Sequence, residues 1–371
     1  MILAAVRSFV RREPVLLIAA LAALITCFFV PPDAKYLGYL DLRTLALLYC
    51  LMTVVGGLRQ AGLFSRLAHS LCENAANLRM ISLLLVMLCF FTSMLITNDV
   101  ALLTFVPFAV VVMGMAHHQR ELIHVVVLQT IAANLGSMLT PVGNPQNLYL
   151  YSFYDLGFGE FLGITFPIWL LSLLLLLLFS LLIRSEKLAL FLGEAPEVDK
   201  RAIGVYFALF AVCLLVVLRV IPWYWMLGIL ITVLLIYDRK LLLKADFMLL
   251  LTFVAFFVFS GNLARIPKIS EAIRSLMTGR EYLTSLLASQ VISNVPAALL
   301  LSGFTDQSHA LLLGVNIGGL GTPIASLASL IALKLYSHSE HADSARFLVE
   351  FTVLNVLFLL VLSAAARLFL L

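Results

Sequence analysis

The chain has 371 residues, of which 63% are hydrophobic and only 12% are charged. Soluble domains are roughly half apolar and a quarter charged, so this composition excludes an ordinary soluble protein and indicates a polytopic membrane protein. The formal net charge of +4 comes from 24 Lys and Arg scattered between apolar runs. No basic stripe is formed, and we expect no nucleic acid among the partners.

Apolar stretches of about 20 residues predict membrane-crossing helices. Seven stretches are continuous, at 14–30, 41–60, 160–183, 201–219, 222–238, 245–262 and 345–370. Two more, 121–150 and 308–336, are interrupted by glycines, prolines and polar residues, which gives about nine spans. Two further segments, 79–116 and 281–303, are interrupted by polar triplets. We read both as re-entrant hairpins, although the first is long enough to cross twice.

The two interrupted stretches repeat one another. Residues 133–148 read ANLGSMLTPVGNPQNL, and residues 315–330 read VNIGGLGTPIASLASL. At one constant offset, the matched pairs are Asn134 and Asn316, Gly136 and Gly318, Thr140 and Thr322, and Pro141 and Pro323. The predicted span at 201–219 lies between the two copies, and this one extra crossing reverses the orientation of the second copy in the membrane. The pattern therefore predicts an inverted-repeat transporter fold with two discontinuous helices. The expected parts are a first repeat at 1–183, a linker and connecting helix at 184–221, and a second repeat at 222–371.

The distribution of positive charge predicts the orientation. With a cytoplasmic N-terminus, 16 of the 24 Lys and Arg fall on the cytoplasmic side, as the positive-inside rule expects. We therefore expect an integral protein of a bacterial-type inner membrane whose N-terminus is cytoplasmic.

A helix is broken inside hydrocarbon only where protein or a wet cavity covers the freed backbone groups, since each unpaired group costs several kcal/mol. Half-helix N-termini suit an anion, whereas free carbonyls at half-helix C-termini suit a bare cation. Neutral side chains near the breaks and hairpin tips add donors and acceptors. The candidate substrate- and ion-binding residues are Thr97, Asn98, Asp99, Asn134, Thr140, Pro141, Gly143, Asn144, Ser293, Asn294, Asn316, Gly318, Thr322, Pro323 and Ser326.

Asp99 is the one carboxylate in these motifs, and Val295 stands at the matching place in the second half. Burying a carboxylate in a membrane is costly unless it pairs, binds a cation or takes a proton. We therefore assign Asp99 to coupling through Na⁺ or a proton, with Na⁺ placed near Asn98, Asp99, Asn134 and Asn144. The alternative is a structural carboxylate that caps the following half-helix.

At four motifs the sequence resembles the ion transporter superfamily, which includes arsenite permeases, sodium/proton antiporters, citrate transporters and divalent-anion/sodium symporters. LTPVGNPQN resembles its first unwound helix, and VNIGGLGTPIASLASLI resembles the second-half motif of arsenite-permease-like members. LITNDVALL and VISNVPAALLL resemble the hairpin tips, which read Ser-Asn-Thr in the symporters. The resemblance implies two clamp sites that often bind Na⁺, with substrate between them, a homodimer and an elevator-like movement.

Two departures from that pattern matter. The tips read TND and SNV, which weakens the case for a dicarboxylate. Ala325 replaces a glycine that many relatives have, and 327–329 lack the Pro-Gly-rich ending of the first motif, which indicates that one ion site is altered or absent.

The sequence therefore predicts a secondary active transporter of a small anion or oxyanion, coupled to Na⁺ or H⁺. The alternatives are a cation/proton antiporter that uses Asp99 and an arsenite-type efflux permease. An enzyme is not expected, because no catalytic triad or metal spacing emerges from the broken helices. The glycines of GGLGTP at 318–323 lack the Lys-Ser/Thr of a nucleotide loop, so no cofactor beyond Na⁺ is expected.

Overall fold

The computed structural model describes residues 13–73, 75, 77–115, 119–187, 194–339 and 342–371. Within these ranges the chain is all-α and has no strand. The helices of the first half are α2 (Pro14–Phe29), α3 (Leu42–Gln60), α4 (Leu63–Cys72), α5 (Leu78–Ile96), α6 (Asn98–Met115), α7 (Gln119–Ser137), α8 (Pro145–Phe153) and α9 (Phe158–Leu181). Those that follow are α10 (Lys200–Val217), α11 (Trp223–Tyr237), α12 (Phe247–Ala264), α13 (Pro267–Met277), α14 (Glu281–Ile292), α15 (Asn294–Leu301), α16 (Ser308–Ile317), α17 (Leu327–Ser337) and α18 (Ser344–Phe369).

Six of these helices, α3, α5, α9, α10, α12 and α18, are long and apolar enough to cross a bilayer. Other helices, among them α2, α11 and the arms of the broken stretches, are apolar but shorter. The architecture is that of a polytopic membrane protein, while the count of about nine spans and the inverted repeat stay predictions. Segment 79–116 contains α5, which is long enough to cross a bilayer, and α6, which is among the shorter apolar helices. Two crossings by this segment therefore stay an alternative to a re-entrant hairpin.

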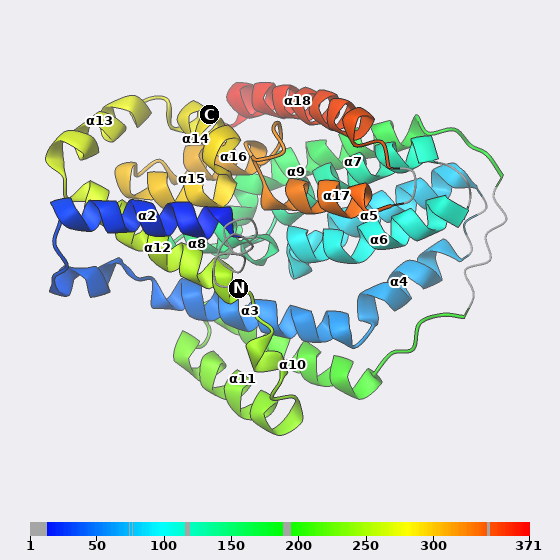
Figure 1. Cartoon of the computed structure of the whole chain (residues 1–371), viewed down its shortest axis with the longest axis horizontal. Helices are drawn as coiled ribbons and strands as arrows, with labels where there is room; N and C mark the ends of the chain where they lie inside the picture. Colours follow the sequence, from blue (N-terminus) through cyan, green and yellow to red (C-terminus); the bar gives the residue numbers. More distant parts are fainter. Residues whose placement is uncertain (1–12, 74, 76, 116–118, 188–193, 340–341) are drawn as a thin grey trace, which may run out of the picture.

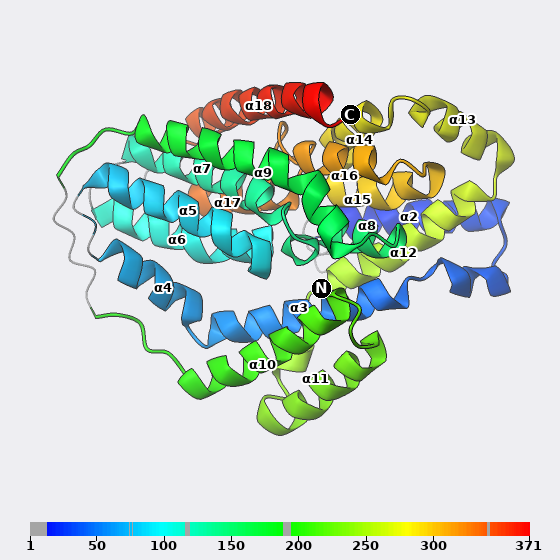
Figure 2. The same ribbon diagram turned by 180° about the vertical axis from the view of Figure 1, so that it is seen from behind.

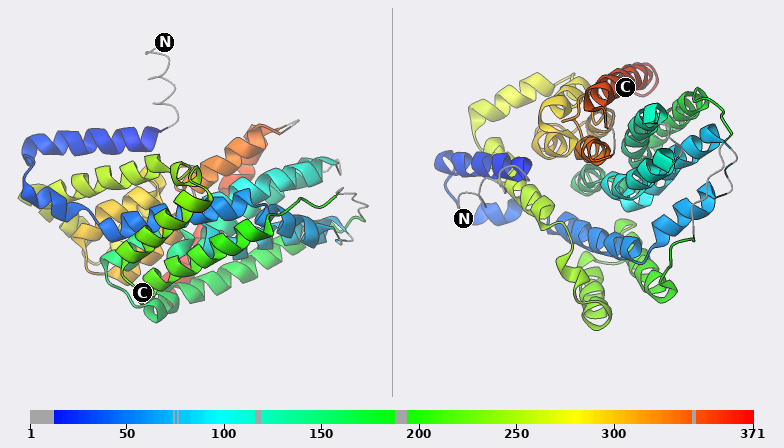
Figure 3. Two further views of the ribbon diagram at one scale, coloured as in Figure 1. Left: turned by 90° about the horizontal axis from the view of Figure 1, so that it is seen from below. Right: turned by 45° about the vertical axis from the view of Figure 1, so that its right-hand side comes forward.

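The helices pack as two bundles. The straight-helix bundle consists of α2, α3, α10, α11 and α12, and the broken-helix bundle consists of α5 to α9 and α14 to α18. Figure 2 shows the same division from behind, with α10 and α11 below α3 and with α5, α7 and α9 above it. The axes of most helices lie roughly parallel to one another (Figure 3, left). Each bundle takes helices from both halves of the sequence, and the bundles meet where α3 contacts α8 and α12 contacts α15.

Side-chain caps fix where several helices begin. Asp41 accepts a hydrogen bond from the backbone N–H of Thr44 (3.0 Å), and Asp246 accepts one from Leu249 (2.9 Å). These two carboxylates start α3 and α12, one helix in each half of the sequence. An N-cap stabilises a helix by about 1 kcal/mol, because it satisfies one of the amides left free in the first turn.

An ion pair joins the loop after α2 to the end of α12. Arg265 Nη2 lies 2.7 Å from Asp33 Oδ2, and Arg265 Nη1 lies 3.0 Å from Asp33 Oδ1. Hydrogen bonding to the guanidinium holds the pKa of Asp33 below its ordinary value. A lowered pKa means that the pair adds stability while the carboxylate is ionised and loses it as the pH falls through that pKa.

We expect Asp33→Asn to lower the melting temperature at neutral pH by a small amount, since the pair is partly solvated. The difference from wild type should shrink as the pH falls from the ordinary Asp pKa of about 3.9 through the lowered pKa, because the wild-type carboxyl then also becomes neutral. Melting curves across this range test the expectation, with Asp306→Asn as the control for an exposed carboxylate. A difference that stays constant with pH would contradict it.

Candidate functional site

Both interrupted stretches contain a non-helical segment. In the first, α7 ends at Ser137 and α8 begins at Pro145, with a short 3₁₀ turn at Pro141–Gly143 between them. In the second, α16 ends at Ile317 and α17 begins at Leu327. We call 138–144 the first break and 318–326 the second break. The two breaks place free backbone groups and half-helix ends inside the broken-helix bundle.

The tips of the two hairpins share one strained backbone geometry. Thr97 joins α5 to α6 with φ 71° and ψ 150°, and Ser293 joins α14 to α15 with φ 74° and ψ 153°. This region is essentially reserved for glycine and costs other residues on the order of 1–3 kcal/mol. The next residue then turns its side chain back, so that Asn98 Oδ1 accepts from Asp99 N (3.0 Å) and Asn294 Oδ1 from Val295 N (2.9 Å).

A buried set of amides and hydroxyls joins the first tip to the two breaks. Asn134 Oδ1 accepts from Asn98 Nδ2 (3.1 Å) and from Ser326 Oγ (2.9 Å). Asn144 Nδ2 donates to Asn316 Oδ1 (3.3 Å). Of the predicted residues, Asn98, Asn134, Asn144, Asn316 and Ser326 are therefore linked across the two halves. The Nδ2 of Asn134 is buried and has no hydrogen-bond partner among the described residues.

The remaining predicted residues hold the breaks in shape. Thr140 Oγ1 donates to the carbonyl of Met94, and Ser293 Oγ donates to Ala325 O (3.3 Å). Gly143 packs against the backbone of Ser137, where a Cβ would lie 2.8 Å from the carbonyl carbon. Pro141 and Pro323 lie within the two breaks, and Thr322 is exposed at the second. The second tip and the second break therefore lie together, and none of their residues lines the cavity described next.

A cavity of about 280 Å³ lies where the two bundles meet. The straight-helix bundle contributes residues of α3 and α12 to its wall, and the broken-helix bundle contributes the N-terminal ends of α6 and α8. The polar and charged residues in its wall are Arg59, Thr97, Asp99, Asn144, Lys244 and Asp246. Two half-helix N-termini and two cationic side chains thus converge on one space, an arrangement that favours an anion.

Asp99 lies in the first turn of α6 and in the cavity wall. Its Oδ1 is buried and has no hydrogen-bond partner among the described residues. No backbone amide of those residues donates to its carboxylate, so the geometry does not provide the helix cap that the sequence offered as an alternative role. A buried carboxylate oxygen without a donor is a place for a cation or a proton.

Apart from Asp99, the charged groups of the cavity were not found by sequence reasoning. Arg59 Nη2 donates to Leu103 O (3.2 Å), a carbonyl that Pro107 leaves free because proline has no N–H to give it. Lys244 Nζ donates to Gln60 Oε1 (2.5 Å), and Asp246 caps α12. Arg59 and Lys244 entered the sequence analysis only in the charge count, because no periodicity connects residues on separate helices.

Two side-chain amides that bind the break carbonyls were also missed. Asn147 Nδ2 donates to the carbonyls of Ser137 (3.4 Å), Met138 (3.2 Å) and Thr140 (3.4 Å). Gln290 Nε2 donates to the carbonyls of Gly318 and Leu320 at the second break. Asn147 stands inside the quoted first motif, so its position was visible in the sequence but its role was not.

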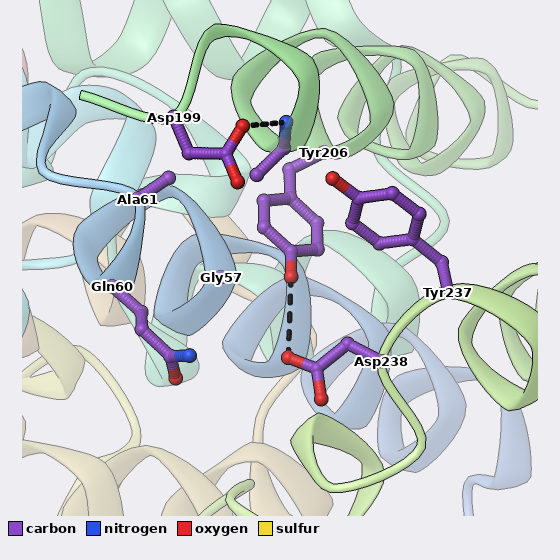
Figure 4. Close-up of a pocket in the computed structure, with 8 residues that line it drawn as sticks. Gly57, Gln60, Ala61, Asp199, Tyr206, Tyr237 and Asp238 are labelled. Carbon is purple, nitrogen blue, oxygen red and sulfur yellow. Dashed lines mark hydrogen bonds between the residues drawn. The ribbon is translucent and has the colours of Figure 1, made fainter.

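A second pocket, also about 280 Å³ in volume, lies between α3, α10 and α11 (Figure 4). Asp199 caps α10 through Ala202 N (3.0 Å), and Tyr206 Oη donates to Asp238 Oδ2 (3.4 Å). Both carboxylates already serve the local structure, and no break or hairpin tip reaches this pocket. The cavity beside Asp99 is therefore the better candidate for a transport site.

Comparison with known proteins agrees with the resemblance seen in the motifs. The chain matches the family model described as citrate transporter over residues 1–310. It is 32% identical to an uncharacterized transporter of Methanocaldococcus jannaschii, over 88% of this chain and 90% of that protein. It is 31% identical to the inner membrane protein YbiR of Escherichia coli, over 83% of this chain and 84% of that protein. A silicon efflux transporter of Oryza sativa subsp. japonica is 31% identical over 38% of this chain and 29% of its own length.

Proposed function

Because the chain belongs to the citrate transporter family of the ion transporter superfamily, as its motifs predicted, we propose that it is a secondary active transporter of a small anion or oxyanion. The observation that supports this proposal best is the cavity between the bundles. There two half-helix N-termini, Arg59 and Lys244 face the same space as the carboxylate of Asp99, whose Oδ1 has no hydrogen-bond partner in the part of the chain that the structure describes. Its volume of about 280 Å³ suits a small solute.

The charges of the cavity suggest how an ion and an anion are coupled. With Asp99 ionised, the two carboxylates balance Arg59 and Lys244. When a proton or Na⁺ neutralises Asp99, one positive charge is left over, and an anion is bound more strongly. By linkage, the anion must then strengthen binding of the cation by the same factor. This reciprocity is the thermodynamic basis of symport.

The position of the cavity supports an elevator-type movement. Its wall is divided between the straight-helix bundle and the broken-helix bundle, so sliding one bundle along the other would carry Asp99 and the half-helix ends away from Arg59 and Lys244. Arg59 and Lys244 fall on the cytoplasmic side in the orientation that the charge distribution predicts, with the N-terminus also cytoplasmic. In this proposal the cavity opens inward and the protein is a homodimer.

Thermal stabilisation of the purified protein tests the function directly, because a ligand that binds only the folded state raises stability by mass action. The panel consists of arsenite, sulfate, phosphate, citrate and succinate, each with and without Na⁺ and at two pH values. A shift from one anion that grows with Na⁺ or with lower pH supports the symporter. If Na⁺ or pH alone shifts the melting point and no anion does, a cation/proton antiporter is the better description.

We expect Lys244→Gln to weaken binding of the active anion by roughly tenfold, since it removes one of two cationic groups at the cavity. Titration of the anion against the melting temperature measures the loss. Lys240→Gln is the matched control, because Lys240 is exposed in the same loop and does not line the cavity. Equal effects of the two variants would contradict the assignment.

A further inference from the structure

We propose that the side-chain amide of Gln290 binds the carbonyls of the second break in place of a cation, so that only the first half of the protein responds to a coupling ion. The inference rests on the proposed ion-coupled function. It starts from the carbonyl groups of the second break, because carbonyls freed at the ends of half-helices are groups that can bind a bare cation.

Gln290, near the end of α14, forms hydrogen bonds with several groups of that break. Its Nε2 donates to Gly318 O (2.7 Å) and Leu320 O (3.0 Å). Its Oε1 accepts from Thr322 N (3.0 Å), and its own carbonyl accepts from Thr322 Oγ1 (3.0 Å). A primary amide has two N–H hydrogens, and Nε2 lies closest to these two carbonyls, for which no other donor is found among the described residues. The same nitrogen also lies 3.3 Å from Leu286 O. The uncharged amide therefore binds carbonyl oxygens that a cation would otherwise coordinate.

The backbone of the second break is shaped around this side chain. Gly321 has φ 99°, a conformation that side chains rarely adopt, and a Cβ there would collide with Gln290 Oε1. A Cβ on Gly318 would lie 2.9 Å from Ser289 Cβ and 3.0 Å from Leu286 Cα of α14. Two glycines thus let the break approach α14 closely enough for the amide to reach its carbonyls.

The hairpin tip donates to a further carbonyl of the second break. Asn294 N donates to Ala325 O (2.9 Å), and Ser293 Oγ donates to the same oxygen (3.3 Å). The carbonyls of Gly318, Leu320 and Ala325 therefore all have donors from the hairpin. Val295 follows Asn294 in the second tip, so this tip offers no carboxylate to attract an ion.

The first half differs in both respects. The amide of Asn147 lies 3.2–3.4 Å from three carbonyls, whereas the two contacts of Gln290 with the second break are shorter, at 2.7 and 3.0 Å. Asp99 stands where the second half has Val295, and its Oδ1 lacks a donor among the described residues. The acceptors that remain for an ion are therefore at the first tip.

The decisive variant is Gln290→Glu, which keeps the shape of the side chain and replaces its donor with an acceptor. Three acceptors then face one another with no donor between them, so we expect a lower melting temperature in choline chloride. We expect Na⁺ or Li⁺ to restore it in a saturable manner, and the restoration to persist in the Asp99→Asn background. Asp99→Asn alone should show no such cation shift.

Gln129→Glu is the matched control. Gln129 is buried and donates to Leu85 O (3.4 Å) and Phe105 O (3.3 Å), but these carbonyls belong to unbroken helices. The control should lose stability without being rescued by a particular cation. The proposal is overturned if Gln290→Glu gains no more from Na⁺ or Li⁺ than this control does. It is equally overturned if Asp99→Asn alone keeps a saturable Na⁺ shift.

If Gln290→Glu does not fold, Gln290→Met decides, since it removes the donor without adding a charge. A new cation-dependent rise in its melting temperature supports the proposal, and an unchanged cation response overturns it. None of these readouts requires an anion or transport. A failed anion panel with a positive Gln290→Glu result would therefore reject the proposed function and keep the role of Gln290.

Discussion

Replacing Asp99 with asparagine is expected to abolish the dependence of anion transport on Na⁺ or pH and to lower the rate by more than about tenfold, the equivalent of roughly 1.4 kcal/mol. The variant keeps the size of the side chain and removes the carboxylate whose Oδ1 has no donor among the described residues. Asp99→Asn also fixes the cavity in the charge state that favours the anion. Binding of the anion should therefore persist while its coupling is lost.

Flux into proteoliposomes under an imposed Na⁺ or proton gradient measures the transport part of this expectation, and melting curves with the active anion measure the binding part. Whichever gradient drives wild-type uptake identifies the coupling ion. A variant that still accumulates the anion in response to that gradient would remove Asp99 from the coupling mechanism.

Asp246→Asn is the matched control, because it removes the other negative charge from the same cavity. Asparagine caps helices about as well as aspartate, so the start of α12 should be preserved. This variant should keep its dependence on the coupling ion. If Asp246→Asn loses coupling as completely as Asp99→Asn does, total charge in the cavity is responsible and a specific ion site at Asp99 is not.

Gly136→Ala is expected to have the largest effect on stability. Gly136 of α7 contacts α5 so closely that a Cβ would collide with the carbonyl of Phe90 and lie 2.6 Å from Ser93 Oγ. A backbone carbonyl in a packed helix cannot give way as the end of a long side chain can. Overpacking of this kind costs typically 1–3 kcal/mol and occasionally more, so the variant should melt well below wild type.

Gly163→Ala in α9 is the control for that substitution. No atom outside its own helix lies within 4 Å of a Cβ built there, and alanine is the better helix former by up to about 1 kcal/mol. The control should therefore melt at or above the wild-type temperature. If both variants melt alike, the tight contact between α5 and α7 does not limit stability.

The all-α membrane class and the family could be predicted from the sequence, because each depends on strong local signals. Apolar runs of spanning length define the class, and prolines, glycines and asparagines within such runs mark the breaks. The broad family was confirmed by the match over residues 1–310. The predicted spans agree with the helices to within a few residues where both are continuous, as at 41–60 and α3.

The contacts between segments far apart in the chain could not be predicted in this way. That Ser326 donates to Asn134, or that Lys244 shares a cavity with Asp99, depends on how whole helices cross, which a repeat of residue types does not fix. Gln290 was missed for a different reason. A glutamine at the end of an apolar helix has no distinctive spacing, and its two carbonyl partners become visible only when the second break folds against α14.

The hydrogen bond from Arg59 to the carbonyl of Leu103 crosses from the straight-helix bundle to the broken-helix bundle. Pro107 makes this bond necessary, because it leaves that carbonyl without its own helical donor. If the bundles slide past each other during transport, this bond must break, and the carbonyl must find water or another donor before the bilayer isolates it. Through this hydrogen bond, Pro107 can thus slow the sliding step of the transport cycle until water reaches the interface between the bundles.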